Sequence, residues 1–408
     1  MKTRILLGLI LLMMPILSGC WSRIEVNDLA FVTAAGIDKM EDGKIRLALQ
    51  VAIPRMLGAA GQGGFGGEKG IGTKAVWVVS EKGETILDAY RRLQEKLPRR
   101  IFFSHSGIIV IGEQMARDGV SPILDFFIRQ REARMRSYII FTKGESVNIL
   151  KFVPKLEKIP AEIMRELVKQ HIGVRINLKD FVHMLVTEGM GPVAAEMELV
   201  SSNLANGEDS KAPSPSNLET NLSIKGSAIF KKDRLVGWMN DLETRGVLWL
   251  RKEMKTGVVT VNIPKEKGNG KISVYILKAE TQITPILSDG ELSMEVKVRA
   301  ENELYENNSK LDVSDPKVIH FVENELEEDL KQRIQIVLDM AQKKFKSDIF
   351  GFGIEVERRY PKEWKNKYKE HWEEEFPKLK VNIIADMTVN RTGLTNKPLI
   401  LKEKESEK

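Results

Sequence analysis

Few residues in this chain have the type and spacing that chemistry on a substrate requires. Cysteine occurs once, at Cys20, so the chain forms no internal disulfide. The histidines form no HExxH motif and have no zinc-ligand spacing with cysteine or aspartate. GxSxG nucleophile elbows and P-loops are also absent. The five histidines are His105, His171, His183, His320 and His371. The sequence therefore predicts no catalytic residue, no metal site and no cofactor.

Two short motifs are weak indications of a functional site. Residues 61–66 match GxGxxG by letters, but a strand is expected to follow at 73–80, where a dinucleotide site needs a helix N-terminus. A glycine-rich loop over 58–72 is the better interpretation. His105 stands between Ser104 and Ser106, and neighbours on an extended chain point to opposite faces. We expect His105 to be structural, with an interface contact as the alternative.

Cys20 has a firmer assignment because of what precedes it. Lys2 and Arg4 are followed by a 13-residue apolar run, 5–17, which is too short for the ~20 residues of a membrane-spanning helix. Leu17-Ser18-Gly19-Cys20 then resembles the lipobox of bacterial lipoproteins. That resemblance implies cleavage before Cys20 and an S-diacylglycerol on its thiol, with N-acylation left open. Two acyl chains hold a protein firmly on a membrane.

Composition bounds the rest of the chain. Of 408 residues, 29% are charged and 42% apolar, as in ordinary globular proteins. The net charge of +6 is diffuse and falls to +4 without Lys2 and Arg4. Nucleic-acid binding needs a dense basic stripe with interleaved aromatic residues, which we do not find. The chain is expected to divide into five regions. These are a signal peptide at 1–19, an N-terminal α+β region at 20–200, a linker or exposed loop at 201–221, a C-terminal α+β region at 222–395 and a charged tail at 396–408. If the C-terminal region holds two domains, we expect the split near 285.

Hydrophobic periodicity predicts an α+β, multi-domain fold in which mixed β-sheets pack with helices. Apolar and alternating runs predict strands, and apolar residues at helical spacing predict helices. The expected strands are 29–37, 44–53, 73–80, 106–111, 136–142, 193–201, 222–230, 235–239, 258–263, 271–284, 291–300 and 379–389. The expected shorter helices are 84–97, 122–131, 161–171, 178–188 and 241–254.

One long amphipathic helix is expected in the last third of the chain. From Val318 to Phe345 the apolar residues recur every three or four positions, which traces one stripe along roughly eight turns. Acidic and basic side chains occupy the other face. We expect this stripe to pack against a sheet, with a partner groove as the alternative.

Three stretches together make the chain similar to the Ger(x)C family, the lipoprotein C subunits of GerA-type spore germinant receptors. The first joins Gly19-Cys20-Trp21 to residues 25–32 and 36–38, and the second spans 104–113. The third and most specific is Lys346-Ser347-Asp348-Ile349-Phe350-Gly351-Phe352-Gly353, followed by Tyr360-Pro361, Trp364, Trp372, Phe376-Pro377 and 391–394.

The resemblance implies a non-enzymatic, lipid-anchored subunit on the outer face of the spore inner membrane, needed for the germination response. It also implies A- and B-type receptor subunits as partners, membrane lipid through Cys20, and a three-domain α+β body. Direct nutrient binding stays open. The alternatives are a solute-binding lipoprotein of a transport system, which needs two similar lobes and a cleft, and a cell-wall hydrolase, which needs a carboxylate pair or a metal site.

For the 346–353 stretch we expect a helix stop and a turn. Gly351 and Gly353 would permit unusual backbone angles, and Phe350 and Phe352 would fill a core. A role in domain architecture is the preferred interpretation, and a partner-binding surface is the alternative.

Overall fold

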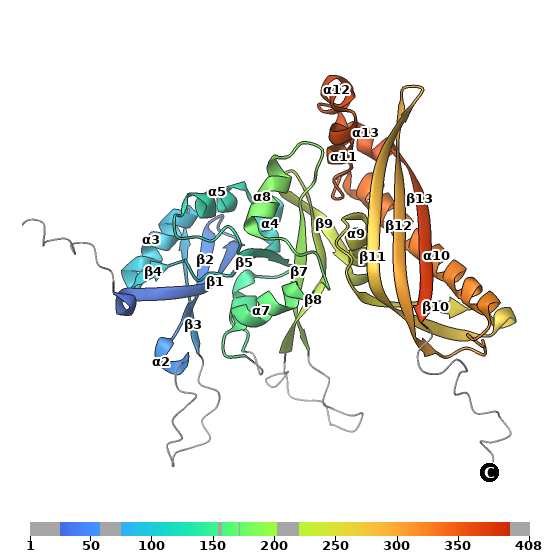
Figure 1. The fold of residues 1–408 in the computed structure, drawn as a ribbon. Helices are drawn as coiled ribbons and strands as arrows, with labels where there is room; N and C mark the ends of the chain where they lie inside the picture. Colours follow the sequence, from blue (N-terminus) through green and yellow to red (C-terminus); the bar gives the residue numbers. More distant parts are fainter. Residues whose placement is uncertain (1–24, 58–74, 154–156, 171, 202–219, 392–408) are drawn as a thin grey trace, which may run out of the picture.

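The computed structural model describes residues 25–57, 75–153, 157–170, 172–201 and 220–391 (Figure 1). Cys20, the glycine-rich segment at 58–72 and the charged tail lie outside the described residues, as do His171 and most of 201–221. None of the described helices is long and apolar enough to cross a membrane.

Helices and strands alternate along the described chain. The strands are β1 (Leu29–Lys39), β2 (Ile45–Ala52), β3 (Val76–Gly83), β4 (Arg100–Phe102), β5 (Ile108–Gly112), β6 (Tyr138–Thr142), β7 (Val193–Ser201), β8 (Thr220–Lys231), β9 (Arg234–Asn240), β10 (Gly257–Ile263), β11 (Gly270–Ser288), β12 (Glu291–Asn307) and β13 (Lys380–Arg391). The helices are α2 (Pro54–Leu57), α3 (Ile86–Lys96), α4 (Glu113–Asp118), α5 (Ser121–Arg129), α6 (Ser146–Leu150), α7 (Pro160–Lys169), α8 (Leu178–Val186), α9 (Asp241–Leu250), α10 (Pro316–Asp339), α11 (Phe352–Arg359), α12 (Pro361–Glu363) and α13 (Trp372–Glu375). The α+β prediction with mixed sheets is confirmed.

A nine-stranded sheet forms the left half of the molecule in Figure 1. Its order is β3-β2-β1-β5-β6-β7-β8-β9, with β4 paired to β1. Within it β1, β5, β6 and β7 run parallel. Strand β5 is buried on both faces, as its unbroken apolar sequence predicted. Ile109 and Ile111 contact the cluster that includes α3, α5 and α8, whereas Ile108 and Val110 contact the cluster of α6 and α7.

The strands on either side of the expected boundary at 201–221 belong to this one sheet. Strands β7 and β8 flank it and pair with each other from Val193↔Ile229 to Ser201↔Thr220. The change from one sheet to the other comes later, between the end of β9 and the start of β10, where α9 lies. A split near 285 would fall within β11. The prediction of a linker or an exposed loop at 201–221 stays a prediction, because residues 202–219 lie outside the described residues.

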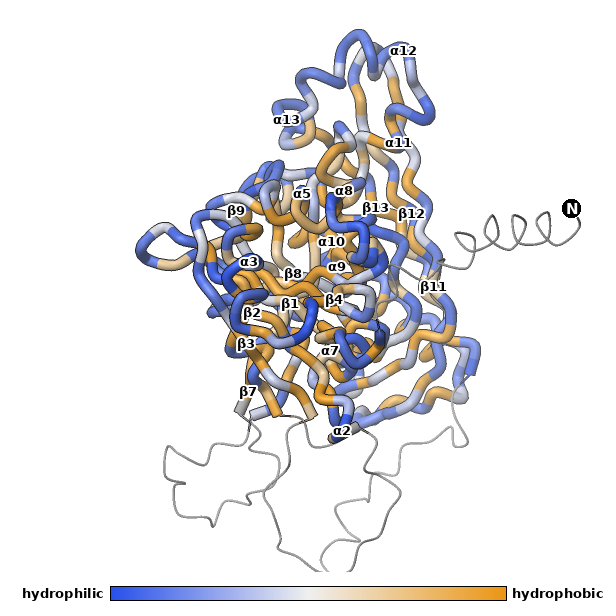
Figure 2. Tube along the Cα trace, turned by 90° about the vertical axis from the view of Figure 1, so that its left-hand side faces the viewer, coloured by the Kyte–Doolittle hydropathy of each residue, from blue (hydrophilic) through white to orange (hydrophobic). Residues whose placement is uncertain are grey.

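A four-stranded sheet, β10-β11-β12-β13, forms the other half, and α10 covers it (Figure 1). The predicted stripe of α10 is buried at Val322, Leu326, Leu330, Ile334 and Val337. Packing of this long helix against a sheet is therefore confirmed. In Figure 2 apolar residues concentrate in the strands, and hydrophilic residues occupy the outer turns near α12.

The long helix is less uniform than its periodicity predicted. After Asp339 the backbone continues as a π-helix, Met340–Phe345, and ends at Lys346 with a left-handed φ of 50°. Helix α4 was not expected, and α9 ends at Leu250 instead of 254. Six-residue α4 is too short to show a clear helical period, so its pattern does not differ from that of a loop.

Candidate functional site around Asp348

The residues singled out for chemistry do not converge in the structure. Cys20 is outside the described residues, and the four described histidines are exposed. His105 packs the edge of its ring against Phe31, with 5.3 Å between ring centroids. Over the described ranges, no group of three or more His, Cys, Asp or Glu side chains could hold a metal ion.

The family-matching stretch 346–353 instead surrounds one buried carboxylate. Oδ1 of Asp348 accepts hydrogen bonds from the backbone N–H groups of residues 350, 351 and 352, at 2.9–3.2 Å. Oδ2 accepts from the N–H of Gly353 at 2.9 Å and from the indole Nε1 of Trp372 at 3.0 Å. Asp348 is 4% exposed, so five donors share one desolvated carboxylate.

Burial raises the pKa of Asp348 to about 6, although the hydrogen bonds from Gly353, Phe352, Trp372 and Gly351 act to lower it. No Lys or Arg of the described chain forms an ion pair with this carboxylate. Its charge is therefore stabilised only by N–H dipoles, including those of the first turn of α11, where a helix favours negative charge.

Glycines on both sides allow the backbones to meet here. Gly351 has the left-handed φ of 81° that the sequence suggested. For Gly353 the expected reason was wrong: its backbone is helical, and a Cβ would lie 2.6 Å from Cα of Gly189. Gly189 is itself left-handed, with φ 76°. Gly353 is thus needed for close backbone approach instead of an unusual angle.

Three hydrogen bonds join this stretch to the nine-stranded sheet and to α9. The backbone N–H of Gly191 donates to the carbonyl of Asp348 at 2.7 Å. Ser347 Oγ donates to the carbonyl of Phe230 at 2.6 Å, and Arg251 Nη1 donates to that of Ile349 at 2.9 Å. We call residues 346–353 with Gly189, Gly191 and Trp372 the Asp348 junction. It connects segments more than a hundred residues apart in the chain.

Aromatic side chains fill the space behind the carboxylate. Phe352 and Phe376 are almost fully buried, and Trp364 contacts Trp372 with ring centroids 5.2 Å apart. Phe350 packs on Phe352 with a centroid separation of 5.4 Å. The motif therefore faces inward, which favours the architectural interpretation of these residues.

A groove of about 920 Å³ runs along the outside of the junction. It lies between the 185–191 segment, the β8–β9 turn and residues 369–378. Ion pairs cross it, from Lys369 to Glu188 at 2.9 Å and from Lys231 to Glu373 at 3.1 Å. These charges are exposed and paired, and the buried Asp348 also lines the groove.

Sequence reasoning missed a second buried carboxylate, Asp38, at the end of β1. Its Oδ2 lies 2.7 Å from Nη2 of Arg46, and Oδ1 accepts the N–H of Ser146 at 2.6 Å. Arg46 also pairs with Glu145 at 3.0 Å. The signal was present, because Asp38 directly follows an apolar strand, but its partner could not be chosen from the sequence.

Glu196 on β7 was also missed. It is 1% exposed and lies 2.5 Å from Nζ of Lys143. Burial raises the pKa of Glu196 to about 7, and Lys143 partly opposes that rise. In the sequence, this buried site was indicated by a carboxylate inside the apolar run 193–200.

Comparison with known proteins decides the family. The model described as "Spore germination protein N-terminal domain" matches residues 22–199, and "Spore germination B3/GerAC like, C-terminal" matches residues 225–393. The chain belongs to the Ger(x)C family of spore germination proteins. Gly189 and Gly191 lie in the first matched region and Asp348 in the second, so the Asp348 junction connects the two regions of this Ger(x)C protein.

Relatives match over nearly their whole length. YfkR from Bacillus subtilis (strain 168) is 32% identical over 389 residues, covering 95% of this chain and 97% of that protein. Spore germination protein KC from the same strain is 30% identical over 405 residues, covering 96% of each. The crystal structure of the GerBC protein has the same fold, with a TM-score of 0.55 and 20% identity over 87% of this chain and 96% of that one.

Proposed function

We propose that this protein is a lipid-anchored, non-catalytic subunit of a spore germinant receptor complex, needed for the germination response. The observation that carries the proposal is the match of both family models over residues 22–199 and 225–393. Relatives named spore germination protein KC, B3 and A3 support it. The Asp348 junction supports it too, since its most distinctive residues build the interior.

The anchor belongs to the same proposal. Cleavage after residue 19 would leave Cys20 as the first residue, carrying diacylglycerol on its sulfur, and two acyl chains suffice for stable membrane attachment. The body would then lie on the outer face of the spore inner membrane, beside A- and B-type receptor subunits. The division into an N-terminal region at 20–200 and a C-terminal region at 222–395 is part of this proposal, although β7 and β8 on either side of 201–221 pair with each other.

Substitution of Cys20 tests the anchor. We expect Cys20→Ala to abolish fractionation with membranes and detergent-phase partitioning, because no acyl chain can be attached. Ser22→Ala, two residues away, is the matched control and should fractionate as the unaltered protein does. Detergent-phase partitioning of Cys20→Ala equal to that of the control would refute lipidation.

Recovery from spore membranes tests the complex. Affinity capture of the anchored protein should retain A- and B-type receptor subunits. Capture of a transporter permease instead would favour the solute-binding alternative, which the groove of about 920 Å³ keeps worth testing. Thermal stabilisation of the protein by an amino acid or a sugar is the direct measurement for that alternative.

A further inference from the structure

The parallel strands of the nine-stranded sheet begin at one edge, and exposed basic side chains collect there. Three segments meet at this edge: 99–100 at the start of β4, 131–136 before β6, and 175–179 before α8. Their exposed cationic residues are Arg99, Arg100, Arg131, Arg134, Arg136, Arg175 and Lys179. We call these seven residues the basic edge.

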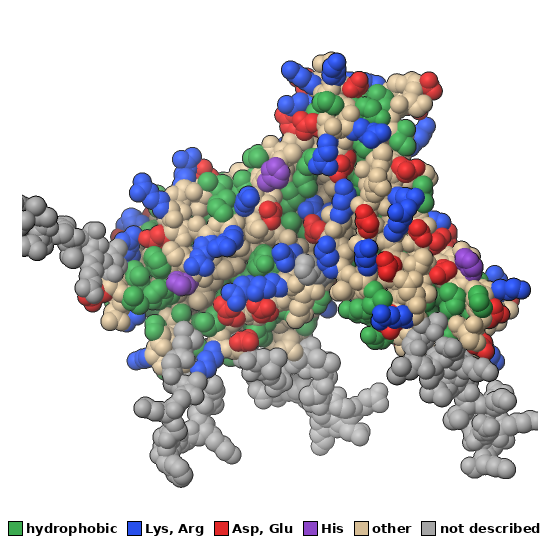
Figure 3. Space-filling model, viewed as in Figure 1, with side chains coloured by type: hydrophobic (Ala, Val, Ile, Leu, Met, Phe, Trp, Pro, Cys, Tyr) green, Lys and Arg blue, Asp and Glu red, His purple; other side chains and the backbone are tan. Residues whose placement is uncertain are grey.

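An ion pair and a backbone hydrogen bond make the basic edge continuous. Arg100 Nη2 lies 2.8 Å from Glu132 Oε1, which joins the first segment to the second. The backbone N–H of Lys179 donates to the carbonyl of Met135 at 3.0 Å, which joins the second to the third. Basic side chains are visible on the face of the nine-stranded sheet shown in Figure 3.

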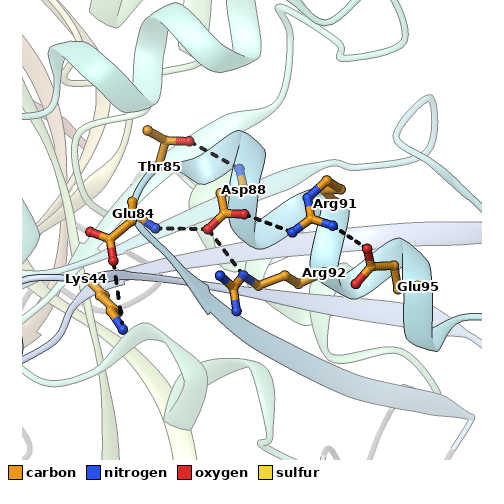
Figure 4. A network of polar contacts seen from close by, with 7 residues as sticks. All are labelled: Lys44, Glu84, Thr85, Asp88, Arg91, Arg92 and Glu95. Carbon is orange, nitrogen blue, oxygen red and sulfur yellow. Dashed lines mark hydrogen bonds and ion pairs between the residues drawn. The ribbon is translucent and has the colours of Figure 1, made fainter.

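Most of this charge is not neutralised within the protein. Arg100 pairs with Glu132, but across the described ranges the other six residues of the basic edge form no ion pair. The arginines of α3 differ. Arg91 and Arg92 both pair with Asp88, at 3.3 and 3.2 Å, and Arg91 also pairs with Glu95 (Figure 4). Unpaired cations confined to one edge leave a positive potential there.

The same edge is where the described chain begins. Leu29, the first residue of β1, pairs with Arg100 of β4 in the parallel register. From Cys20 to Leu29 there are nine residue steps, which span at most roughly 32 Å when extended. A lipid on Cys20 would therefore limit how far the start of β1, and the arginines beside it, can lie from the headgroups. One apolar side chain, Val26, is 68% exposed there, between the exposed carboxylates of Glu25 and Asp28.

We propose that the basic edge docks on a layer of anionic lipid headgroups and thereby orients the anchored body on the membrane. This rests on the lipid anchor of the proposed function. Arginine side chains bind phosphate oxygens through two N–H groups, and attraction to an anionic surface acts within a Debye length of about 8 Å at physiological salt. The anchor fixes one point of the body, and the basic edge would fix which face turns toward the bilayer.

The test measures the distance between this edge and the membrane. Because Cys20 is the only cysteine and is acylated in the proposal, a second cysteine can be labelled alone. The exposed His105, next to β4, serves as the position: lipidated full-length His105→Cys is labelled with a donor dye and reconstituted in vesicles with an acceptor on the headgroups. One set contains phosphatidylcholine alone, and the other contains equal parts of phosphatidylcholine and phosphatidylglycerol.

We expect energy transfer to be at least twofold higher on the anionic vesicles, and the difference to vanish near 1 M salt, where the Debye length is about 3 Å. Adding Arg131→Glu, Arg134→Glu and Arg136→Glu should remove the difference. The matched control is Arg359→Glu, Lys362→Glu and Lys365→Glu, which makes the same charge change around α12, far from β4 in Figure 1, and should keep it.

The outcomes separate the two proposals. If the labelled protein does not float with either vesicle, the lipid anchor fails. If it floats with both but transfers energy equally, or if the two triple variants behave alike, docking of the basic edge is overturned while the anchor stands.

Discussion

Asp348 and Asp38 are both buried carboxylates, but different groups stabilise them. Both carboxylates are almost fully buried, at 4% and 3% exposure. The Asp38 carboxylate binds the N–H of Ser146, 108 positions away, whereas the Asp348 carboxylate binds nearby N–H groups and the residue makes its long-range contact through its backbone carbonyl, which accepts from Gly191. Asp38 faces a cation, Arg46, in addition to the N–H of Ser146. Asp348 has five N–H donors and no ion-pair partner in the described chain.

The difference shows what each site depends on. The Asp38 site depends on a charge pair, whose loss leaves Arg46 without its most buried partner. The Asp348 site depends on four backbone N–H groups that a side-chain substitution cannot remove, together with the indole of Trp372, so these donors stay buried when the acceptor is lost. The junction between the two family-matched regions is therefore the less tolerant of the two sites.

The largest expected effect comes from Asp348→Ala. Five buried donors would lose their acceptor, and at about 1–3 kcal/mol for each unsatisfied group the loss should reach at least about 5 kcal/mol of unfolding free energy. Urea unfolding of the purified protein in detergent, followed by circular dichroism, measures it. Glu357→Ala, exposed on the same helix α11, is the matched control. An unfolding midpoint for Asp348→Ala equal to that of the control would contradict the role given to the junction.

A double-mutant cycle on Asp38 and Arg46 comes next. We expect Asp38→Ala to cost about 3 kcal/mol, because the half-buried Arg46 loses its most buried partner and keeps only Glu145, and the buried N–H of Ser146 loses its acceptor. In an Arg46→Met background the same substitution should cost at least about 1 kcal/mol less, since the two residues are in contact. Strictly additive losses would show that the ion pair contributes nothing, and the contrast with Asp348 would then disappear.

Sequence patterns predicted the elements here better than the contacts between them. The apolar stripe of α10 and the apolar strand β5 could be predicted from the sequence, because burial imposes a pattern of apolar residues along the chain. The pairing of β7 with β8 could not be predicted from the sequence, because it depends on backbone groups that composition does not report.

The junction could be located but not explained from the sequence. Gly351, Phe350 and Phe352 predicted a turn whose aromatic side chains are buried in a core. The structure has both the turn and the buried side chains. The close approach of Gly353 to Gly189 is a tertiary contact across more than 160 residues. The five hydrogen bonds to Asp348 come from residues 350–353 and from Trp372, but the sequence does not show that this carboxylate is buried among them. The contacts of Asp38 could not be predicted either, because its partner Ser146 is 108 positions away in the chain.

The smallest expected effect is the pH dependence of the Asp348 site, which sharpens the contrast with Asp38. The folded pKa of about 6 lies above the ordinary value of 3.8, so the native state binds the proton more tightly than the unfolded chain does. Its contribution to stability is fully present below about pH 4 and is lost as the pH rises through 6, by at most about 3 kcal/mol. Asp348→Asn cannot titrate, so the stability gap between the unaltered protein and this variant should narrow between pH 4 and 6. A gap that instead widens over this range would mean that the five N–H donors outweigh burial and depress the pKa of Asp348.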